Sequence, residues 1–219
     1  MRNKLVIFDL DGTLLNTIGD LAVACDHMLN LRTLPTHSYE EYCTFVGNGI
    51  LRLVERALPE ELREESYVKA ARADFLAYYI EHIDERTQSY DGIISLVAEL
   101  QARGYKLAVA SNKFQAGTEK LISKFFPDVE FVEVCGNREG VPLKPDTALL
   151  DIILQKAGIA RERCIMVGDS AVDIMTAHNA NIHSIGVTWG FRSREELIEA
   201  KAEYMVDTAD ELLATIESI

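Results

Sequence analysis

The chain has 219 residues, 48% of them hydrophobic and 26% charged, and its formal net charge is −13. A chain of this length and composition can bury a sizeable core, as one large domain or two unequal ones. The acidic balance argues against a nucleic-acid partner, and no apolar run reaches the roughly 18 residues of a membrane span. An anionic ligand would need local positive charge, from a metal ion or a few lysines, to overcome the general field.

The start of the chain and its cysteines favour a cytoplasmic protein. The charged segment Met1–Lys4 is followed by an apolar stretch that stops at Asp9, which is too short for a signal peptide. The cysteines have no metal-ligand or redox-pair spacing, so we expect four reduced and mostly buried thiols, Cys25, Cys43, Cys135 and Cys164. The five histidines form no recognisable metal cluster.

The first predicted element is a buried strand over residues 5–8, Leu-Val-Ile-Phe. The segment Asp9-Leu10-Asp11-Gly12-Thr13 follows it directly, so the strand presents two carboxylates and a glycine at its carboxyl end. Alternation along the extended chain sends Asp9 and Asp11 to the same side, where they repel unless a cation or a proton intervenes. The alternative is a solvated Asp-Gly turn.

From residue 17 to about residue 86 the hydrophobic pattern is helical, with no convincing strand. Three apolar stripes carry this prediction: Leu21, Ala24, Cys25, Met28 and Leu29; Ile50, Leu51, Val54 and Leu58; and Val68, Ala71, Phe75, Tyr78 and Tyr79. We therefore predict a small all-helical cap domain over residues 16–89, inserted after the first strand. Residues 1–15 and 90–219 would form the core.

From residue 91 onward, helix and strand patterns alternate. Helices are predicted over 93–103, 115–126, 146–157, 171–180, 194–200 and 209–217, and strands over 107–110, 131–134, 164–167, 184–187 and 204–206. Such alternation predicts an α/β fold with a doubly wound, Rossmann-like parallel sheet.

Polar residues follow further predicted strands. Ser111-Asn112 ends the second strand, Asp169 follows the 164–167 strand with Asp173 four residues later, and Lys144-Pro145 precedes a helix. Each group has a plain structural alternative: a turn for Ser111-Asn112, a solvated lysine, and a helix N-cap for Asp169. Together they place carboxylates, a hydroxyl, an amide and a lysine at one edge of one sheet.

These motifs, in this order and over essentially the whole chain, resemble the four motifs of the haloacid dehalogenase-like hydrolase superfamily. An aspartate at position 11 resembles the phosphatases of that superfamily rather than its dehalogenases. The cap segment 45–58 and the segment 186–191 are similar to phosphoglycolate phosphatases. The chain departs from the pattern at Asn16, where relatives commonly carry Asp, and at Phe191-Arg192, where many carry Tyr-Asn.

The resemblance implies a Mg²⁺-dependent phosphatase that works through an aspartyl-phosphate. Asp9 would be the nucleophile and Asp11 the general acid and base. The metal would be held by Asp9, the main-chain carbonyl of Asp11 and Asp169, while Asp173 would orient a metal-bound water or Lys144. The phosphate would be bound by Gly12, Thr13, Ser111, Asn112 and Lys144.

Substrate choice would fall to the cap, because the core contacts only the phosphoryl group. Gly47, Asn48 and Gly49 precede a helix that carries Arg52, and main-chain amides at a helix start favour an anion; the alternative is a plain turn with a solvated arginine. The expected substrate is 2-phosphoglycolate. Alternatives are a pyrophosphatase or another small-metabolite phosphatase, a sugar phosphomutase like β-phosphoglucomutase, and a non-catalytic sensor of a phosphorylated ligand. We expect a small phosphorylated metabolite as partner, neither nucleic acid nor membrane, and a monomer or homodimer.

Overall fold

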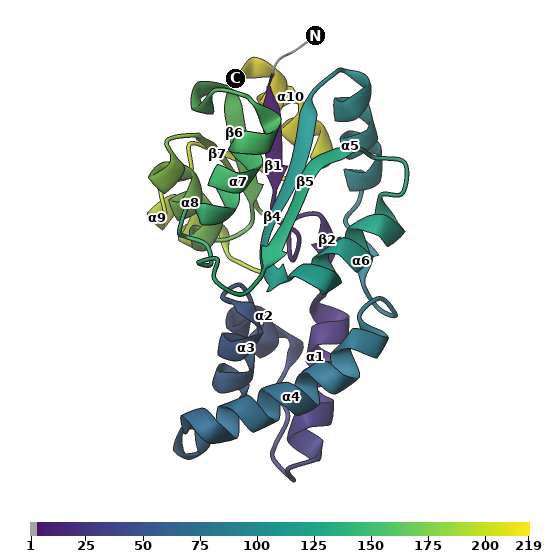
Figure 1. Ribbon diagram of the computed structural model, residues 1–219, viewed down its shortest axis with the longest axis vertical. Coiled ribbons are helices and arrows are strands. Elements are labelled where there is room, and N and C mark those ends of the chain that lie inside the picture. The colour runs from purple at the N-terminus through teal and green to yellow at the C-terminus, as the bar shows by residue number, and fades with distance from the viewer. Residues whose placement is uncertain (1–3) are drawn as a thin grey trace.

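The computed structural model describes residues 4–219, so Met1–Asn3 of the predicted N-terminal segment lie outside the described residues. The main sheet has six parallel strands, and Figure 1 shows it above a group of helices. In spatial order the strands are β5 (Phe131–Asn137), β4 (Lys106–Phe114), β1 (Leu5–Phe8), β6 (Cys164–Gly168), β7 (His183–Val187) and β8 (Tyr204–Val206). The predicted fold class is confirmed.

Helices cover both faces of the sheet, because its strands are apolar on both sides. In β1, Val6 and Phe8 belong to one hydrophobic cluster, whereas Leu5 and Ile7 belong to the other. The first cluster includes α5 (Ile93–Ala102), α6 (Gln115–Phe125) and α10 (Ala209–Ser218), and the second includes α7 (Ala148–Ala157) and α8 (Ala171–Ala180). The short helix α9 (Arg194–Glu199) packs beside α8.

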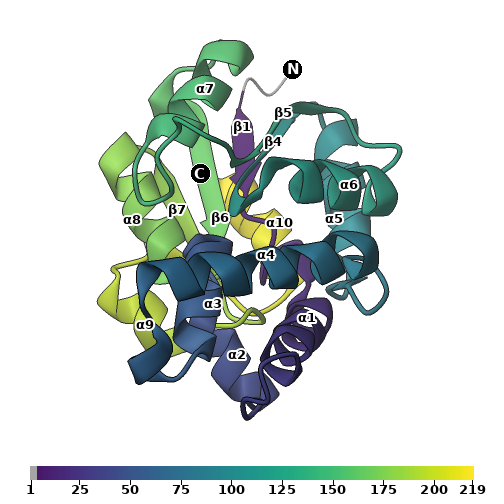
Figure 2. The same ribbon diagram turned by 60° about the horizontal axis from the view of Figure 1, so that its bottom comes forward.

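The helices inserted after β1 lie beyond the carboxyl ends of β1 and β4, and Figure 2 shows α4 crossing in front of the sheet. They are α1 (Ile18–Asn30), α2 (Tyr39–Phe45), α3 (Gly49–Ala57) and α4 (Glu65–His82). We call these four helices and their loops the cap; the assignment of residues 16–89 to a separate domain stays a prediction. The apolar faces of α1, α3 and α4 join the cluster that includes α5. None of the helices described within residues 4–219 has the length and apolar character that a bilayer crossing requires.

Two chain segments connect the cap to the sheet, and they are joined to each other. Their short strands, β2 (Leu15–Asn16) and β3 (Gln88–Ser89), pair in antiparallel fashion. Near them, the buried Asp20 carboxylate accepts hydrogen bonds from the Arg86 amide at 2.9 Å and from the Thr87 amide and hydroxyl, both at 2.8 Å. A carboxylate with several main-chain donors fixes both segments as one unit.

The structure differs from the sequence prediction in several places. β4 continues to Phe114, beyond the expected end at residue 110, because it keeps pairing with β5. The strands β2 and β3 were not expected, since two-residue strands leave no periodic signal. Leu51 is 47% exposed instead of joining the apolar stripe of α3, and α7 begins at Ala148, three residues after Pro145. All four cysteines are free thiols; Cys43 is half-buried and the others are buried.

The role of Asp20 can be tested by its effect on stability. We expect Asp20→Ala to lower the free energy of unfolding by about 2–3 kcal/mol, because main-chain N–H groups would lose their hydrogen-bond acceptor. Denaturant unfolding measures this loss. The control is Asp128→Ala at an exposed position, and equal stability of the two variants would show that Asp20 does not hold the connection.

Candidate active site

The candidate site lies where the strand order reverses, at the carboxyl ends of β1, β4 and β6. Asp9 follows β1, and its main-chain N–H donates to the Val167 carbonyl of β6 at 2.9 Å. Asp169 follows β6, and Ser111 lies near the end of β4. Parallel strands therefore bring to one place groups that are more than 150 residues apart in the sequence.

Three buried carboxylates form the centre of the site. Asp9, Asp169 and Asp173 each offer one oxygen, and these atoms lie within 4.8 Å of one another. The residues are 8%, 2% and 0% exposed, so neither Asp9 nor Asp169 is the solvated turn or simple cap considered above. The N-cap of α8 is Ser170, whose side chain and main chain form a capping box with Asp173.

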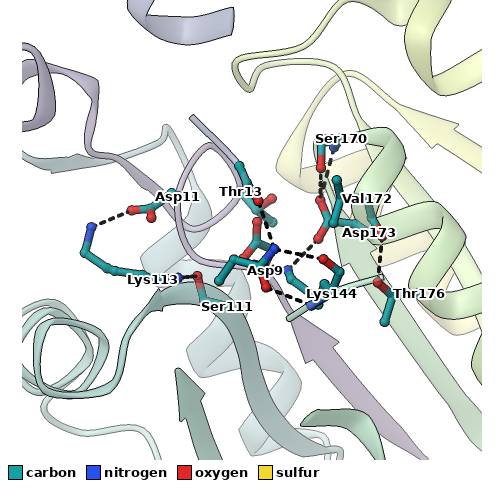
Figure 3. A network of polar contacts seen from close by, with 12 residues as sticks. Asp9, Asp11, Thr13, Ser111, Lys113, Lys144, Ser170, Val172, Asp173 and Thr176 are labelled. Atoms are coloured by element: carbon teal, nitrogen blue, oxygen red, sulfur yellow. Dashed lines mark hydrogen bonds and ion pairs between the residues drawn. The ribbon is translucent and has the colours of Figure 1, made fainter. Parts of the chain in front are cut away.

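Lys144 lies between two of these carboxylates, as Figure 3 shows. Its Nζ is 2.9 Å from Asp9 Oδ1 and 2.6 Å from Asp173 Oδ1, and the residue is 3% exposed. The Asn112 side chain fixes the lysine backbone: its Oδ1 accepts from the Lys144 N–H at 2.8 Å, and its Nδ2 donates to the Lys144 carbonyl at 3.1 Å. Lys144 is therefore a buried and oriented cation rather than a solvated one.

The remaining oxygens of the acidic group have distinct partners. Asp173 Oδ2 accepts from the Ser170 hydroxyl at 2.7 Å, so both oxygens of Asp173 already have protein donors. Asp169 accepts from the Thr13 hydroxyl at 3.2 Å and from the Phe191 N–H at 2.8 Å. Asp9 Oδ1 has no hydrogen-bond partner among residues 4–219 apart from its ion pair with Lys144. Asp173 contacts Lys144 directly and is suited to orienting it, whereas Asp169 is hydrogen-bonded by neutral donors only, so the negative charge of Asp9 and Asp169 exceeds the positive charge beside them.

The negative charge of the three carboxylates exceeds the positive charge of Lys144 unless a cation binds beside them. Burial raises the pKa of Asp9 to about 7, against the lowering effect of Lys144, and burial with the neighbouring Asp173 and Asp9 raises that of Asp169 well above its ordinary range. Burial lowers the pKa of Lys144, but the carboxylates of Asp173 and Asp9 outweigh it and raise that pKa above its usual value. One lysine thus faces three carboxylates. Buried oxygen ligands with excess negative charge can hold a metal ion.

The turn after Asp9 packs closely on Asp169. Gly12 has φ +87°, and a Cβ atom there would lie 2.3 Å from Asp169 Oδ2, so this close approach requires glycine. The Thr13 hydroxyl is engaged by Asp169, and its carbonyl accepts from Trp189 Nε1 at 3.1 Å. The main-chain N–H groups of Gly12 and Thr13 donate to the carbonyls of Leu15 at 2.9 Å and Leu10 at 3.3 Å, so phosphate binding by these two residues stays a prediction.

Asp11 lies on the other side of Asp9 and is held by two donors. Its Oδ1 accepts from the Thr17 hydroxyl at 2.7 Å and from Lys113 Nζ at 3.0 Å. Asp11 adds no side-chain oxygen to the acidic group. The expected metal ligand is its main-chain carbonyl, and this too stays a prediction.

A small cavity connects this site to the cap. Its wall from the core includes Asp9, Asp11, Ser111, Asn112, Lys113, Asp169, Ser170, Phe191 and Arg192, and its wall from the cap includes Leu21, Val46, Gly47, Gly49, Ile50, Leu53 and Tyr79. The cap contributes mainly apolar side chains and main chain.

The predicted cap residues separate into two groups. Gly47 and Gly49 line the cavity, but Asn48 and Arg52 do not. Asn48 accepts from Arg56 at 2.8 Å, and the exposed Arg52 pairs with Glu55 at 2.5 Å. A role of Asn48 and Arg52 in specificity stays a prediction.

Two core residues hold the cap against the site. Asn112 Nδ2 donates to the Gly47 carbonyl at 2.9 Å, so both of its amide protons are used by main-chain acceptors. Arg192 donates to the carbonyls of Cys43 at 2.7 Å and Val46 at 2.6 Å, at the end of α2. A guanidinium at a helix C-terminus satisfies carbonyls that the helix leaves unpaired. The departure from the family pattern at Arg192 thus provides a contact between core and cap.

Lys113 and Tyr79 are not among the predicted site residues, although both line the cavity. Lys113 lies two residues after Ser111 in β4, beyond the predicted end of that strand at residue 110 and within an irregular part of its pairing with β5, so the strand pattern did not point to it. Tyr79 had no such signal, because its spacing fits a helix core position equally well.

The fold and the site define an α/β protein whose acidic centre lies beneath a helical cap, and comparisons give its family. Residues 6–187 match the family of haloacid dehalogenase-like hydrolases. A phosphoglycolate phosphatase from Vibrio cholerae is 33% identical to this chain, and the match covers 97% of this chain and 96% of that protein. A phosphoglycolate phosphatase from Colwellia psychrerythraea is 31% identical, and the match covers 99% of this chain and 98% of that protein. A crystal structure from Lactobacillus delbrueckii subsp. bulgaricus superposes with a TM-score of 0.93 at 31% identity and covers 99% of each chain. The chain belongs to the haloacid dehalogenase-like hydrolase family.

Metal binding can be tested without measuring activity. Saturating Mg²⁺ should raise the Tm by about 5–10 °C at a hundred times its Kd, because it neutralises buried carboxylates. The rise should be larger at pH 8 than at pH 6, since below about pH 7 Asp9 holds a proton that the metal must displace.

Asp169→Asn should abolish this rise in Tm, whereas the exposed Asp128→Asn should keep it. Thermal unfolding with and without metal gives the comparison. An equal rise in wild type and Asp169→Asn would place the metal elsewhere.

Proposed function

We propose that this hydrolase is a Mg²⁺-dependent phosphatase that cleaves a small phosphate monoester through an aspartyl-phosphate on Asp9. The observation that carries the proposal is the buried Asp9 carboxylate at the end of β1, with Lys144 at 2.9 Å and Asp169 beside it. An ionised carboxylate can attack phosphorus directly, provided that the charge of the phosphate is neutralised. Mg²⁺ held by Asp9, Asp169 and the Asp11 carbonyl would supply that neutralisation.

In the first step, an oxygen of Asp9 forms a bond to phosphorus and the bond from phosphorus to the leaving oxygen breaks. Asp11 gives its proton to that oxygen, and the alcohol leaves. Lys144, held by Asp173 at 2.6 Å, stabilises the charge on the phosphoryl oxygens. The Ser111 hydroxyl, which lines the cavity, binds the same oxygens.

In the second step, water attacks the phosphorus of the aspartyl-phosphate. Asp11 takes a proton from that water, the bond to Asp9 breaks, and inorganic phosphate leaves. The cap limits the access of other groups to the intermediate, because residues of α1, α3 and α4 form one wall of the cavity.

The substrate that the site supports best is 2-phosphoglycolate, whose carboxylate would lie toward the cap. The N-cap position of α3 is Asn48, but its side chain binds Arg56 and makes no capping hydrogen bond. The N–H groups of the first turn of α3 are therefore not capped by Asn48, and Gly49 and Ile50 of this turn line the cavity. The names of the relatives from Vibrio cholerae and Colwellia psychrerythraea support the same substrate.

The two catalytic aspartates differ in the expected effect of their removal. Asp9→Asn should lower kcat by about 10⁴-fold or more, because an amide is not a usable nucleophile here. Asp11→Asn should lower it by about 10²–10⁴-fold, the usual contribution of a general acid and base. Phosphate release by purified, folded variants measures both. If Asp9→Asn kept a substantial fraction of wild-type activity, Asp9 would not be the nucleophile.

Substrate choice can be tested with a matched pair of phosphates. We expect kcat/KM to be at least about tenfold higher for 2-phosphoglycolate than for 2-hydroxyethyl phosphate, which lacks the carboxylate. Pyrophosphate and glucose phosphates complete the panel. Equal kcat/KM values for the pair would reject 2-phosphoglycolate as the substrate without contradicting the phosphatase activity. Ligand binding without any phosphate release would indicate a sensor.

A further inference from the structure

Lys113 and Tyr79 have no role in the steps above, yet both contact the surroundings of Asp11. Lys113 Nζ lies 3.0 Å from Asp11 Oδ1 and donates a hydrogen bond to the Tyr79 hydroxyl at 2.6 Å. The lysine side chain is 2% exposed and Tyr79 is fully buried. A lysine held out of water needs a partner for its charge, and Asp11 supplies it.

We propose that Lys113, steadied by Tyr79, is a positioning residue that holds the Asp11 carboxyl group in place for proton transfer to the leaving oxygen. The inference rests on the proposed function, in which Asp11 is the general acid. Lys113 would then contribute to catalysis without contacting the phosphate.

The contacts leave one oxygen of Asp11 available. The Thr17 hydroxyl and Lys113 Nζ both bind Oδ1, and within residues 4–219 Oδ2 accepts no hydrogen bond. Two donors on one oxygen fix the plane of the carboxyl group, because rotation about its bond would break both contacts. Oδ2 is then the oxygen that exchanges a proton with the leaving group.

The holding groups come from both parts of the molecule. Lys113 belongs to β4 of the core, Tyr79 belongs to α4 of the cap, and Thr17 directly precedes α1. The Lys113 ammonium also lies 4.9 Å from the centre of the Tyr79 ring. The orientation of Asp11 therefore depends on a lysine whose second partner is supplied by the cap.

The leaving group provides a readout that a loss of folding would not imitate. An alkoxide must be protonated as it leaves, whereas p-nitrophenolate leaves readily without a proton. Lys113→Met should lower kcat/KM for 2-phosphoglycolate by about 10–100-fold and that for p-nitrophenyl phosphate by less than about threefold. The loss should lie in kcat rather than KM, because Lys113 does not bind the substrate in this proposal.

Tyr79→Phe tests the second half of the proposal with a smaller change. It should lower kcat/KM for 2-phosphoglycolate by about three- to tenfold, again sparing the aryl phosphate. The double variant should be no worse than Lys113→Met alone, because Tyr79 acts through Lys113. The matched controls are Tyr42→Phe, which removes another cap hydroxyl bonded to Asp26, and Lys120→Met at an exposed position; both should match wild type.

Asp11→Asn, measured on the same two substrates, separates the proposals. If Asp11→Asn lowers kcat/KM equally for both substrates, Asp11 is not the general acid and the proposed function fails at that step. If Asp11→Asn discriminates but Lys113→Met and Tyr79→Phe do not, only the positioning proposal is overturned. An equal loss on both substrates, or a rise in KM with unchanged kcat, would assign Lys113 to folding or to substrate binding.

Discussion

The arrangement of the site depends on one electrostatic constraint, the burial of three carboxylates around a single lysine. Asp9, Asp169 and Asp173 are almost completely shielded from water, and Lys144 contacts two of them. Unpaired buried charge is costly, so each carboxylate oxygen must be matched by a donor, a proton or a cation. Asp173 is matched by Lys144 and Ser170. Asp169 has a neutral donor on each oxygen, and Asp9 Oδ1 has only its ion pair with Lys144. The excess negative charge on these two buried carboxylates can be neutralised by a metal ion.

Side chains at and near the site also hold the cap against the core. Asn112 uses one amide group to fix the backbone of Lys144 and to bind the Gly47 carbonyl of the cap. Arg192 binds the end of α2, and Asp20 joins the two connecting segments. Because these contacts run through side chains at or beside the site, a displacement of the cap would alter the groups that hold Lys144. Cap position and the geometry of the acidic centre are thus physically linked.

Much of this structure could be predicted from the sequence, because strand ends and helix faces leave strong local patterns. The parallel sheet follows from the alternation of elements, and the grouping of Asp9, Lys144 and Asp169 follows from the rule that parallel strands end at one edge. Lys113 could not be placed without knowing that β4 extends to Phe114, which depends on pairing with β5. The contacts of Arg192 and Tyr79 join segments distant in the sequence, and no local pattern encodes such tertiary contacts.

The composition of the cavity wall limits how the protein can select its substrate. The core side holds the charged groups, including Lys113 and Arg192, but Lys113 is paired with Asp11 and Arg192 with main-chain carbonyls. The cap side is formed by apolar side chains and the start of α3. A second anionic group on the substrate would therefore meet main-chain amides rather than a free guanidinium. Amides recognise a small carboxylate by position, since they cannot reach out as an arginine side chain does, and this favours a short ligand over a long one.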